Sequence, residues 1–136
     1  MRGMIDHLDL TVRDPAKSRG FYEAVLGYMG YTNVRQHESG FDFDMPGEGG
    51  WQCSVGLRKS MGEGEHRIHD RYSPGLHHVA FCAQDRSDVD RLYHVLVDMG
   101  AAILDPPAEY PQYGANYYAV FFADPDGLKL EFVFQG

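Results

Sequence analysis

Two stretches of the chain follow the same plan: HLDLTVRDPAKSRGFYEAVLGYMG at residues 7–30 and HVAFCAQDRSDVDRLYHVLVDMG at residues 78–100. Each begins with a histidine (His7 or His78) and a short run suited to a strand, continues through an aspartate, and ends on the pair Met-Gly. Internal similarity of this kind is the sequence signature of a repeated structural unit. The chain is therefore expected to contain two copies of one module.

Both halves carry a helix signal after the opening strand. Asp14 and Asp85 are suited to cap a helix N-terminus, and Pro15 stands at the first helical position, where a missing N–H is tolerated. Apolar residues then recur at helical spacing in both halves. Gly30 and Gly100 are placed to end the two helices.

Three short strands are expected after each helix. The proline-rich stretch 105–114 is expected to be an irregular loop, because its prolines cannot donate hydrogen bonds to a sheet. The residues thus predict an α+β fold of two tandem βαβββ modules. The six expected strands lie near residues 31–36, 40–45, 51–58, 101–104, 117–123 and 128–134.

Length and composition restrict the class of protein. The 136 residues suit a single domain 1–136, with module one at about 4–58, a linker at 59–74 and module two at about 75–135. The formal net charge of −8 argues against nucleic acid or an anionic membrane as partner, because phosphate binding requires clustered Lys and Arg. No apolar run approaches the roughly 20 residues of a membrane span. The two cysteines predict no disulfide framework, which favours a cytoplasmic location.

Strand alternation places a set of polar residues on the sheet face away from the helices. The apolar residues of the first strand alternate with His7 and Asp9, so these two side chains point away from the helix. The repeat gives His78 the same orientation, and the last strand leaves Lys129 and Glu131 on that side. A carboxylate and two imidazoles on one inner face are costly to bury unless they are paired or bound to a ligand.

Two interpretations fit these residues. His7, His78 and Glu131 form the two-histidine, one-carboxylate set that suits a divalent first-row metal with positions open for water or a bidentate substrate. Alternatively, the histidines are ordinary core or surface residues and Glu131 faces solvent. His77 is expected to have a structural role, because alternation directs its side chain toward the helices or the strand edge.

The segments HLDLTVRDPAKSRGFYEAVLGYMGY, LHHVAF and YYAVFFADPDGLKLEFV together resemble the vicinal oxygen chelate superfamily. This superfamily includes glyoxalase I, extradiol dioxygenases, fosfomycin resistance proteins and bleomycin-binding proteins. The resemblance covers nearly the whole chain apart from the linker. It implies a cup-shaped mixed sheet with helices on its outer face, built around a divalent metal. The ligands lie on the first strand of each module and on the closing strand, which here implies His7, His78 and Glu131.

Departures from the family pattern narrow the expected activity. Aligning GGWQCS with DGLKLE places Ser54 where glyoxalase I carries a second glutamate, and serine is a poor ligand. Asp9 stands where fosfomycin resistance proteins typically carry a threonine, and basic residues for a phosphonate are sparse. Extradiol dioxygenases typically carry an additional module pair, for which this chain is too short. None of these three activities fits cleanly.

The residues and the resemblance together lead us to expect a divalent-metal-dependent enzyme, a lyase, isomerase or oxygenase acting on a small oxygen-rich molecule. The expected metal is Fe, Mn, Ni or Zn. The alternative is a metal-free small-molecule-binding protein of the bleomycin-sequestering kind, and a third hypothesis is a structural or vestigial metal site without activity. Family members commonly pair modules across a dimer, so the resemblance implies a homodimer.

Further residues are candidates for catalysis and substrate binding. Asp9, beside His7, is a candidate general base or a partner that orients an imidazole. The aromatic candidates are equally compatible with plain core packing. The candidates for the pocket wall are Trp51, Gln52, Ser54, Tyr113, Tyr117, Tyr118 and Lys129.

Overall fold

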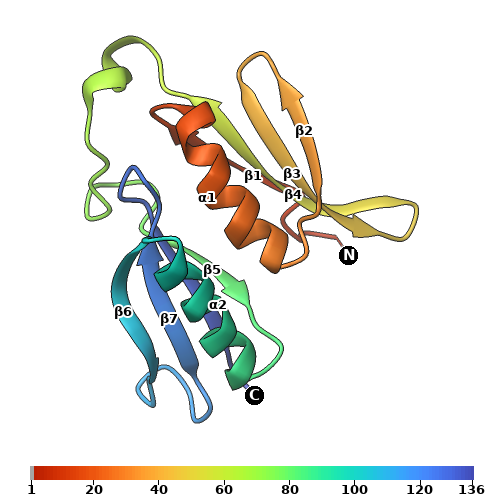
Figure 1. Cartoon of the computed structure of the whole chain (residues 1–136), viewed down its shortest axis with the longest axis vertical. Helices are drawn as coiled ribbons and strands as arrows, with labels where there is room; N and C mark the ends of the chain where they lie inside the picture. Colours follow the sequence, from red (N-terminus) through yellow and green to blue (C-terminus); the bar gives the residue numbers. More distant parts are fainter. Residues whose placement is uncertain (1) are drawn as a thin grey trace. The chain divides into compact units, whose positions relative to one another are not determined.

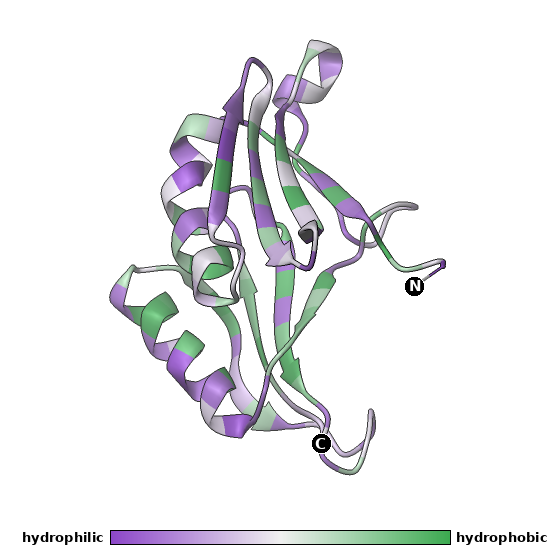
Figure 2. Ribbon diagram, turned by 90° about the vertical axis from the view of Figure 1, so that its right-hand side faces the viewer, coloured by the Kyte–Doolittle hydropathy of each residue, from purple (hydrophilic) through white to green (hydrophobic). Residues whose placement is uncertain are grey.

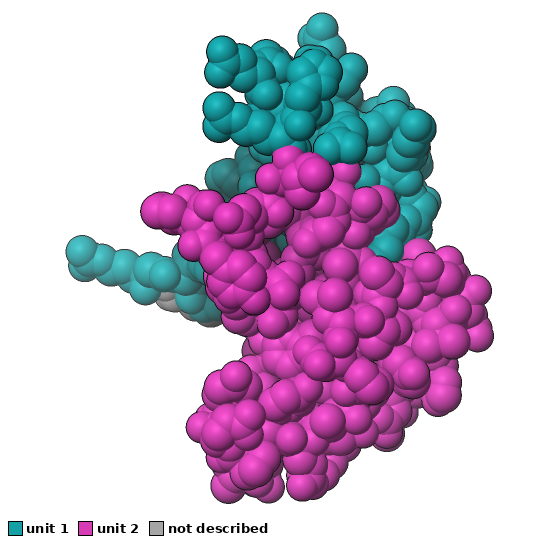
Figure 3. All heavy atoms as spheres, turned by 90° about the vertical axis from the view of Figure 1, so that its left-hand side faces the viewer, with its two compact units in different colours: residues 1–67 teal, residues 68–136 magenta. Residues whose placement is uncertain are grey.

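The chain forms two compact units, unit 1 (Met1–Arg67) and unit 2 (Ile68–Gly136), in a computed structural model that describes residues 2–136 apart from the side chain of Trp51 (Figure 3). The boundary between the units falls within the predicted linker 59–74. That the whole chain forms a single domain remains a prediction. In the part of the chain that the structure describes, no helix has both the length and the apolar character needed to span a membrane.

Each unit has the order strand, helix, three strands (Figure 1), so the predicted two-module α+β fold is confirmed. Unit 1 consists of β1 (His7–Val12), α1 (Pro15–Tyr28), β2 (Asn33–His37), β3 (Gly40–Gly47), β4 (Gly50–Lys59) and the 3₁₀ helix η1 (Gly62–His66). Unit 2 consists of β5 (Val79–Cys82), α2 (Arg86–Asp98), β6 (Ala102–Glu109), β7 (Tyr118–Ala123) and β8 (Lys129–Phe134).

The two units share one sheet topology. Unit 1 has the strand order β1-β4-β3-β2 and unit 2 the order β5-β8-β7-β6, each a four-stranded mixed sheet. The first and last strands of each unit, β1 with β4 and β5 with β8, run parallel, and the remaining pairs are antiparallel. The register places Glu131 of β8 between Ala80 of β5 and Phe121 of β7.

Both helices begin and end where their residues predict. The Asp14 carboxylate accepts hydrogen bonds from two backbone N–H groups of the first turn of α1, and Asp85 accepts one at 2.7 Å from the Asp88 N–H in α2. Such caps satisfy donors that a helix N-terminus leaves without partners. Gly30 and Gly100 follow the helices with φ of +104° and +72°, a conformation that glycine adopts without strain.

In each unit the helix covers one face of the sheet (Figure 1), and polar and apolar residues alternate along the strands (Figure 2). Val25 and Leu26 of α1 are fully buried, as are Leu92 and Leu96 of α2. Their burial contributes to the apolar stabilisation of each unit. The uncovered face of each sheet is thus the surface on which polar groups can be displayed to a ligand.

The predicted loop 105–114 is partly wrong. Strand β6 continues through Pro106 and Pro107 to Glu109. It is the edge strand of its sheet, and its register with β7 shifts between Ile103 and Asp105 and again before Ala108. Prolines are tolerated at an edge with such irregularities, because no ladder hydrogen bond is required of them there. Turns begin only after this strand.

Candidate functional site

A cavity of about 330 Å³ lies in unit 2, on the sheet face away from α2. Its position follows from strand alternation, because Leu130 and Phe132 of β8 belong to the helix-side core and Glu131 between them points the opposite way. The residues that line this cavity are His77, His78, Tyr113, Tyr117, Phe121, Lys129 and Glu131.

Glu131 is the most buried polar group of the cavity, with 1% of its surface exposed. Its Oε2 lies 3.0 Å from Nε2 of His78, and its Oε1 accepts a hydrogen bond from the Tyr117 hydroxyl. Burial, followed by this hydrogen bond to Glu131, raises the pKa of Tyr117 well above its ordinary value, so Tyr117 keeps its proton and acts as a donor. Both carboxylate oxygens therefore have partners.

His77 lies beside His78 in the cavity lining, so the helix-side alternative of its predicted orientation is wrong and the strand-edge alternative stays a prediction. The Nδ1 atoms of the two imidazoles are 2.7 Å apart and their ring centroids 5.0 Å apart. Strand β5 begins at Val79, so both histidines precede the strand and alternation does not force their side chains to opposite faces. Burial, together with the positive charges of neighbouring groups, lowers the pKa of His77.

The two histidines and Glu131 form a directional hydrogen-bond chain. A neutral imidazole has one donor and one acceptor nitrogen, so only one of the two facing Nδ1 atoms carries a proton. If Nε2 of His78 donates to Glu131, its Nδ1 accepts from His77. If Nε2 of His78 is instead unprotonated, its Nδ1–H can donate to His77. His77 can thus support either tautomer of His78.

Aromatic rings form one wall of the same cavity. Tyr113 stacks on Tyr110 with centroids 5.9 Å apart and meets Tyr117 at 5.4 Å. Lys129 Nζ lies 4.6 Å from the centroid of the Phe121 ring, an arrangement typical of a cation–π contact. Three predicted pocket residues, Tyr113, Tyr117 and Lys129, therefore line one cavity.

Tyr118 lies elsewhere in unit 2. Its hydroxyl donates to Asp90 of α2 at 2.6 Å, and the Arg86 guanidinium lies 5.1 Å from the centre of its ring. The hydrogen bond to Asp90, followed by burial, raises the pKa of Tyr118 to about 12. The structure thus places this predicted pocket residue against the helix.

A second cavity, of about 300 Å³, lies in unit 1. His7 is exposed at its edge and its Nδ1 lies 2.8 Å from a carboxylate oxygen of Asp6. This hydrogen bond raises the pKa of His7. Ser54 lies opposite His7 in the parallel pair of β1 and β4, whereas Gln52, two residues earlier on β4, is exposed. The residues that line this cavity are Asp6, His7, Asp9, Arg35, Asp42, Ser54 and Arg58.

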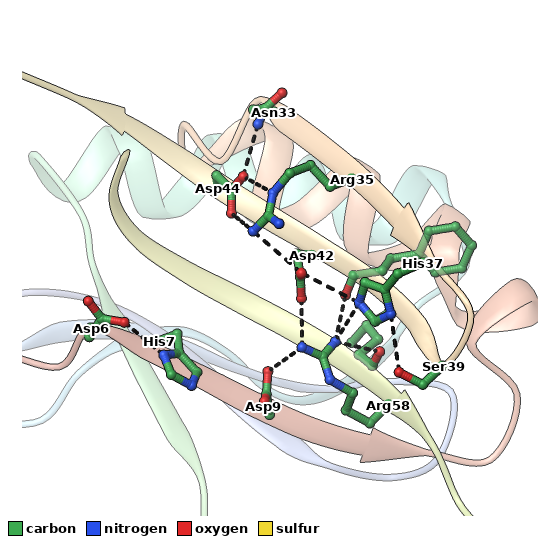
Figure 4. A network of polar contacts seen from close by, with 12 residues as sticks. Asp6, His7, Asp9, Asn33, Arg35, His37, Ser39, Asp42, Asp44 and Arg58 are labelled. Carbon is green, nitrogen blue, oxygen red and sulfur yellow. Dashed lines mark hydrogen bonds and ion pairs between the residues drawn. The ribbon is translucent and has the colours of Figure 1, made fainter. Parts of the chain in front are cut away.

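A network of ion pairs crosses the polar face of the unit 1 sheet (Figure 4). Arg58 on β4 lies between Asp9 on β1, at 3.1 Å, and Asp42 on β3, at 2.9 Å. Arg35 on β2 pairs with Asp44 at 2.6 Å and with Asp42 at 3.4 Å. The network holds Asp9 in an ion pair.

The sequence predictions missed this network. Its signal lies in the run FDFDM of β3, where aspartates alternate with buried phenylalanines and must share the face away from α1. The partners of these aspartates depend on the register of β2, β3 and β4. This register could not be predicted from the sequence alone.

The three predicted metal ligands fall in both units, with His7 in unit 1 and the His78–Glu131 pair in unit 2. Within the described residues, no three His, Cys, Asp or Glu side chains meet in an arrangement that would hold a metal ion. The side chain of Trp51, another predicted pocket residue, lies outside the described part of the structure. The ligand set therefore remains a prediction.

The fold and its comparisons define the class of protein. A two-module βαβββ chain of this kind matches the family described as the Glyoxalase/Bleomycin resistance protein/Dioxygenase superfamily over residues 4–132. The chain belongs to this superfamily, and the resemblance found in the sequence is confirmed.

Individual relatives agree with this assignment. YqjT of Bacillus subtilis (strain 168) is 30% identical over 127 residues, which cover 93% of this chain and 95% of that protein. The metallothiol transferase FosB of Lysinibacillus sphaericus is 30% identical over 128 residues, 94% of this chain and 79% of that protein. A crystal structure of a Bacillus halodurans protein, 28% identical, matches with a TM-score of 0.80 over 98% of this chain and 96% of its own.

Proposed function

We propose that the protein is a divalent-metal-dependent enzyme that performs lyase, isomerase or oxygenase chemistry on a small oxygen-rich substrate. Membership of a superfamily that includes glyoxalases and dioxygenases supports this proposal. The single observation that carries it is the His78–Glu131 pair in the wall of the unit 2 cavity. An imidazole and a buried carboxylate that face each other beside a cavity are donors suited to a divalent cation.

The environment of Glu131 fits a bound cation. Its carboxylate is buried, and no Lys or Arg among residues 2–136 forms an ion pair with it; its partners are an imidazole and a phenol. An ionised carboxylate is costly to bury without a compensating positive charge. A divalent ion beside Glu131 would supply that charge.

The neighbours of the proposed ligands have supporting roles. His77 would accept a hydrogen bond from Nδ1–H of His78, which leaves the Nε2 lone pair of His78 available. Tyr117 would hold the second oxygen of Glu131. A bound divalent metal would polarise adjacent oxygens of the substrate and stabilise the negative charge that develops on them.

His7 is proposed as the third ligand. Its Nδ1 is engaged by the Asp6 carboxylate, so its Nε2 remains available, which is the arrangement that commonly orients a metal-binding histidine. Asp9 is proposed as a proton acceptor or as a group that positions its neighbours. The ion pair between Asp9 and Arg58 supports the positioning role.

Metal content of the purified protein tests the proposal. We expect near-stoichiometric Fe, Mn, Ni or Zn by plasma mass spectrometry, and its loss in His7→Ala, His78→Ala and Glu131→Gln, because each variant removes one donor. The matched control is His94→Ala, since His94 is an exposed histidine of α2 and should leave the metal in place. Absence of metal from the wild type after incubation with divalent ions would refute the metalloenzyme, and full metal retention in a variant would refute that ligand.

A metal-free binding protein is the second candidate function. One observation favours it: both oxygens of Glu131 already have hydrogen-bond partners, and aromatic residues line the cavity beside it. This candidate predicts that small molecules stabilise the chain in a thermal-shift screen and divalent ions do not, whereas the enzyme proposal predicts stabilisation by divalent ions.

We further propose a cytoplasmic homodimer, in keeping with two free cysteines and with the family resemblance.

A further inference from the structure

We propose that the unit 2 cavity binds an aromatic monocarboxylate, with the Lys129 ammonium as the receptor for its negative charge. The inference rests on the proposed function, because it names the class of substrate that the proposed enzyme would bind in the unit 2 cavity. Its grounds are an ammonium without a carboxylate partner, an aromatic wall and a volume suited to a single ring.

Lys129 has no carboxylate partner within the described part of the chain. Its ammonium lies over the Phe121 ring at 4.6 Å in the cavity wall, although acidic residues outnumber basic ones by 20 to 12. Glu131 shares the cavity, but within the described residues it forms no ion pair with Lys129; its oxygens contact His78 and Tyr117. An anionic group of a ligand would therefore find a cation ready to pair with it.

A second cation lies beyond the histidine side of the cavity. The Arg71 guanidinium lies 5.2 Å from the Tyr72 ring centroid, and Tyr72 in turn contacts His77, with ring centroids 5.7 Å apart. The Nε of Arg71 is buried and has no hydrogen-bond acceptor in the described structure. Lys129 and Arg71 thus place positive charge near the cavity in a chain whose net charge is negative.

The wall and the volume select an aromatic ligand. Tyr113, Tyr117 and Phe121 present rings to the cavity, and Tyr110 supports them from behind by stacking on Tyr113 and by an edge contact with Phe121 at 5.3 Å. Rings pack well against such a wall in offset or edge-on geometry. About 330 Å³ is at the small end of the range for ligand cavities, which suits a compound of one ring.

The hydrogen-bond donors of the cavity indicate whether the ligand is a carboxylate or a phosphate. A phosphate-type dianion is usually held by several donors, among them the N–H groups of a helix N-terminus. The first turn of α2 carries Asp85 and Asp88 as its own caps and contributes no residue to the cavity wall. A single ammonium in an aromatic pocket therefore fits a carboxylate better than a phosphate.

Calorimetric titration of the full chain with benzoate and with benzamide, its neutral analogue, tests this inference. Both titrations are performed in EDTA, so that binding is measured independently of metal. We expect benzoate to bind at least about tenfold more tightly than benzamide. Lys129→Met should weaken benzoate about tenfold, which is about 1.4 kcal/mol, and leave benzamide unchanged. The control Lys17→Met, an exposed lysine of α1, should bind benzoate like the wild type.

Two further variants keep the test decisive. Lys129→Arg retains the positive charge and should bind benzoate within a few-fold of the wild type, whereas Tyr113→Ala should weaken both compounds. The inference is overturned if the wild type binds no benzoate at millimolar concentration, if benzamide binds as well as benzoate, or if Lys129→Met keeps wild-type affinity. Absence of metal together with benzoate binding that depends on Lys129 would refute the proposed enzyme and leave this inference standing.

Discussion

At the scale of single residues, the buried carboxylates of the polar sheet faces depend on specific partners. Asp44 of β3 is 1% exposed and accepts hydrogen bonds from Arg35, at 2.6 and 3.0 Å, and from Asn33, at 2.9 Å. These bonds, the one from Arg35 foremost, hold the pKa of Asp44 below its usual range. Glu131 of β8 is equally buried, and its partners are His78 and Tyr117.

Asp44→Asn should lower the free energy of unfolding at pH 7 by about 1–3 kcal/mol, because it removes the charge that Arg35 and Asn33 stabilise. This loss of unfolding free energy is modest for a buried carboxylate because the side chain of its partner, Arg35, is half exposed to solvent. Urea denaturation measures it, with Asp98→Asn, an exposed residue of α2, as the control that should change stability little.

The ion pair between Asp44 and Arg35 also makes the stability of the protein depend on pH. Because the folded-state pKa of Asp44 is lowered, its contribution is complete above the unfolded-state value of about 3.9 and is lost as the pH falls below it through the folded-state pKa. Between about pH 4 and pH 2, Asp44→Asn should therefore lose less stability than the wild type. Equal slopes of unfolding free energy against pH would show that Asp44 contributes nothing to acid sensitivity.

At the scale of elements, two glycines illustrate opposite constraints. Gly40 opens β3 with φ of +154°, and a Cβ built there would lie 1.9 Å from the backbone oxygen of Leu57 on β4. Gly27 lies within α1, and a Cβ there would have no atom within 4 Å. The first glycine is required by the close approach of two strands, and the second is a helix residue that alanine would suit better.

Gly40→Ala should lower the free energy of unfolding by at least about 3 kcal/mol, because β3 and β4 must separate to admit the methyl group. Gly27→Ala should raise it by about 0.5–1 kcal/mol, since alanine restricts the unfolded chain and favours the helix. Parallel urea denaturation of both variants measures the contrast. Stability of Gly40→Ala equal to that of the wild type would contradict the close approach of the two strands.

At the scale of the whole molecule, each unit has one helix on one face of its sheet and a cavity on the other. Strands β1 and β5 are edges of their own sheets, and an edge strand offers unpaired backbone groups to another chain. Large apolar side chains are also exposed, among them Ile5 at 72% and Ile68 at 83%. Together with the family resemblance, these features support the proposed homodimer.

Light scattering coupled to size-exclusion chromatography should give twice the mass of one chain, with dissociation on dilution. The reason is that burial of exposed apolar residues and strand edges stabilises association. Measurement in EDTA serves as the control, because it separates assembly from metal binding. The mass of a single chain at every concentration would contradict the dimer.

Much of the fold and part of the candidate site follow from local patterns. The aspartate caps, the glycine stops and the strand alternation predicted both modules and placed Glu131 and His78 on one face, because each of these signals acts within a few residues. The prediction was wrong for residues 105–109 and for the helix-side alternative of His77. A strand tolerates proline when it lies at the edge of its sheet, as β6 does. Alternation of side chains applies only within a strand, and β5 begins after His77.

The sequence by itself determined the two repeated modules, the face on which Glu131 lies and the superfamily, because chain periodicity and residue chemistry carry that information. Only the tertiary structure decided which groups meet across strands: Tyr117 with Glu131, Arg35 with Asp44 and Arg58 with Asp9. Register and side-chain conformation bring these residues together from distant parts of the chain. The partners of a buried charge are therefore a property of the folded molecule.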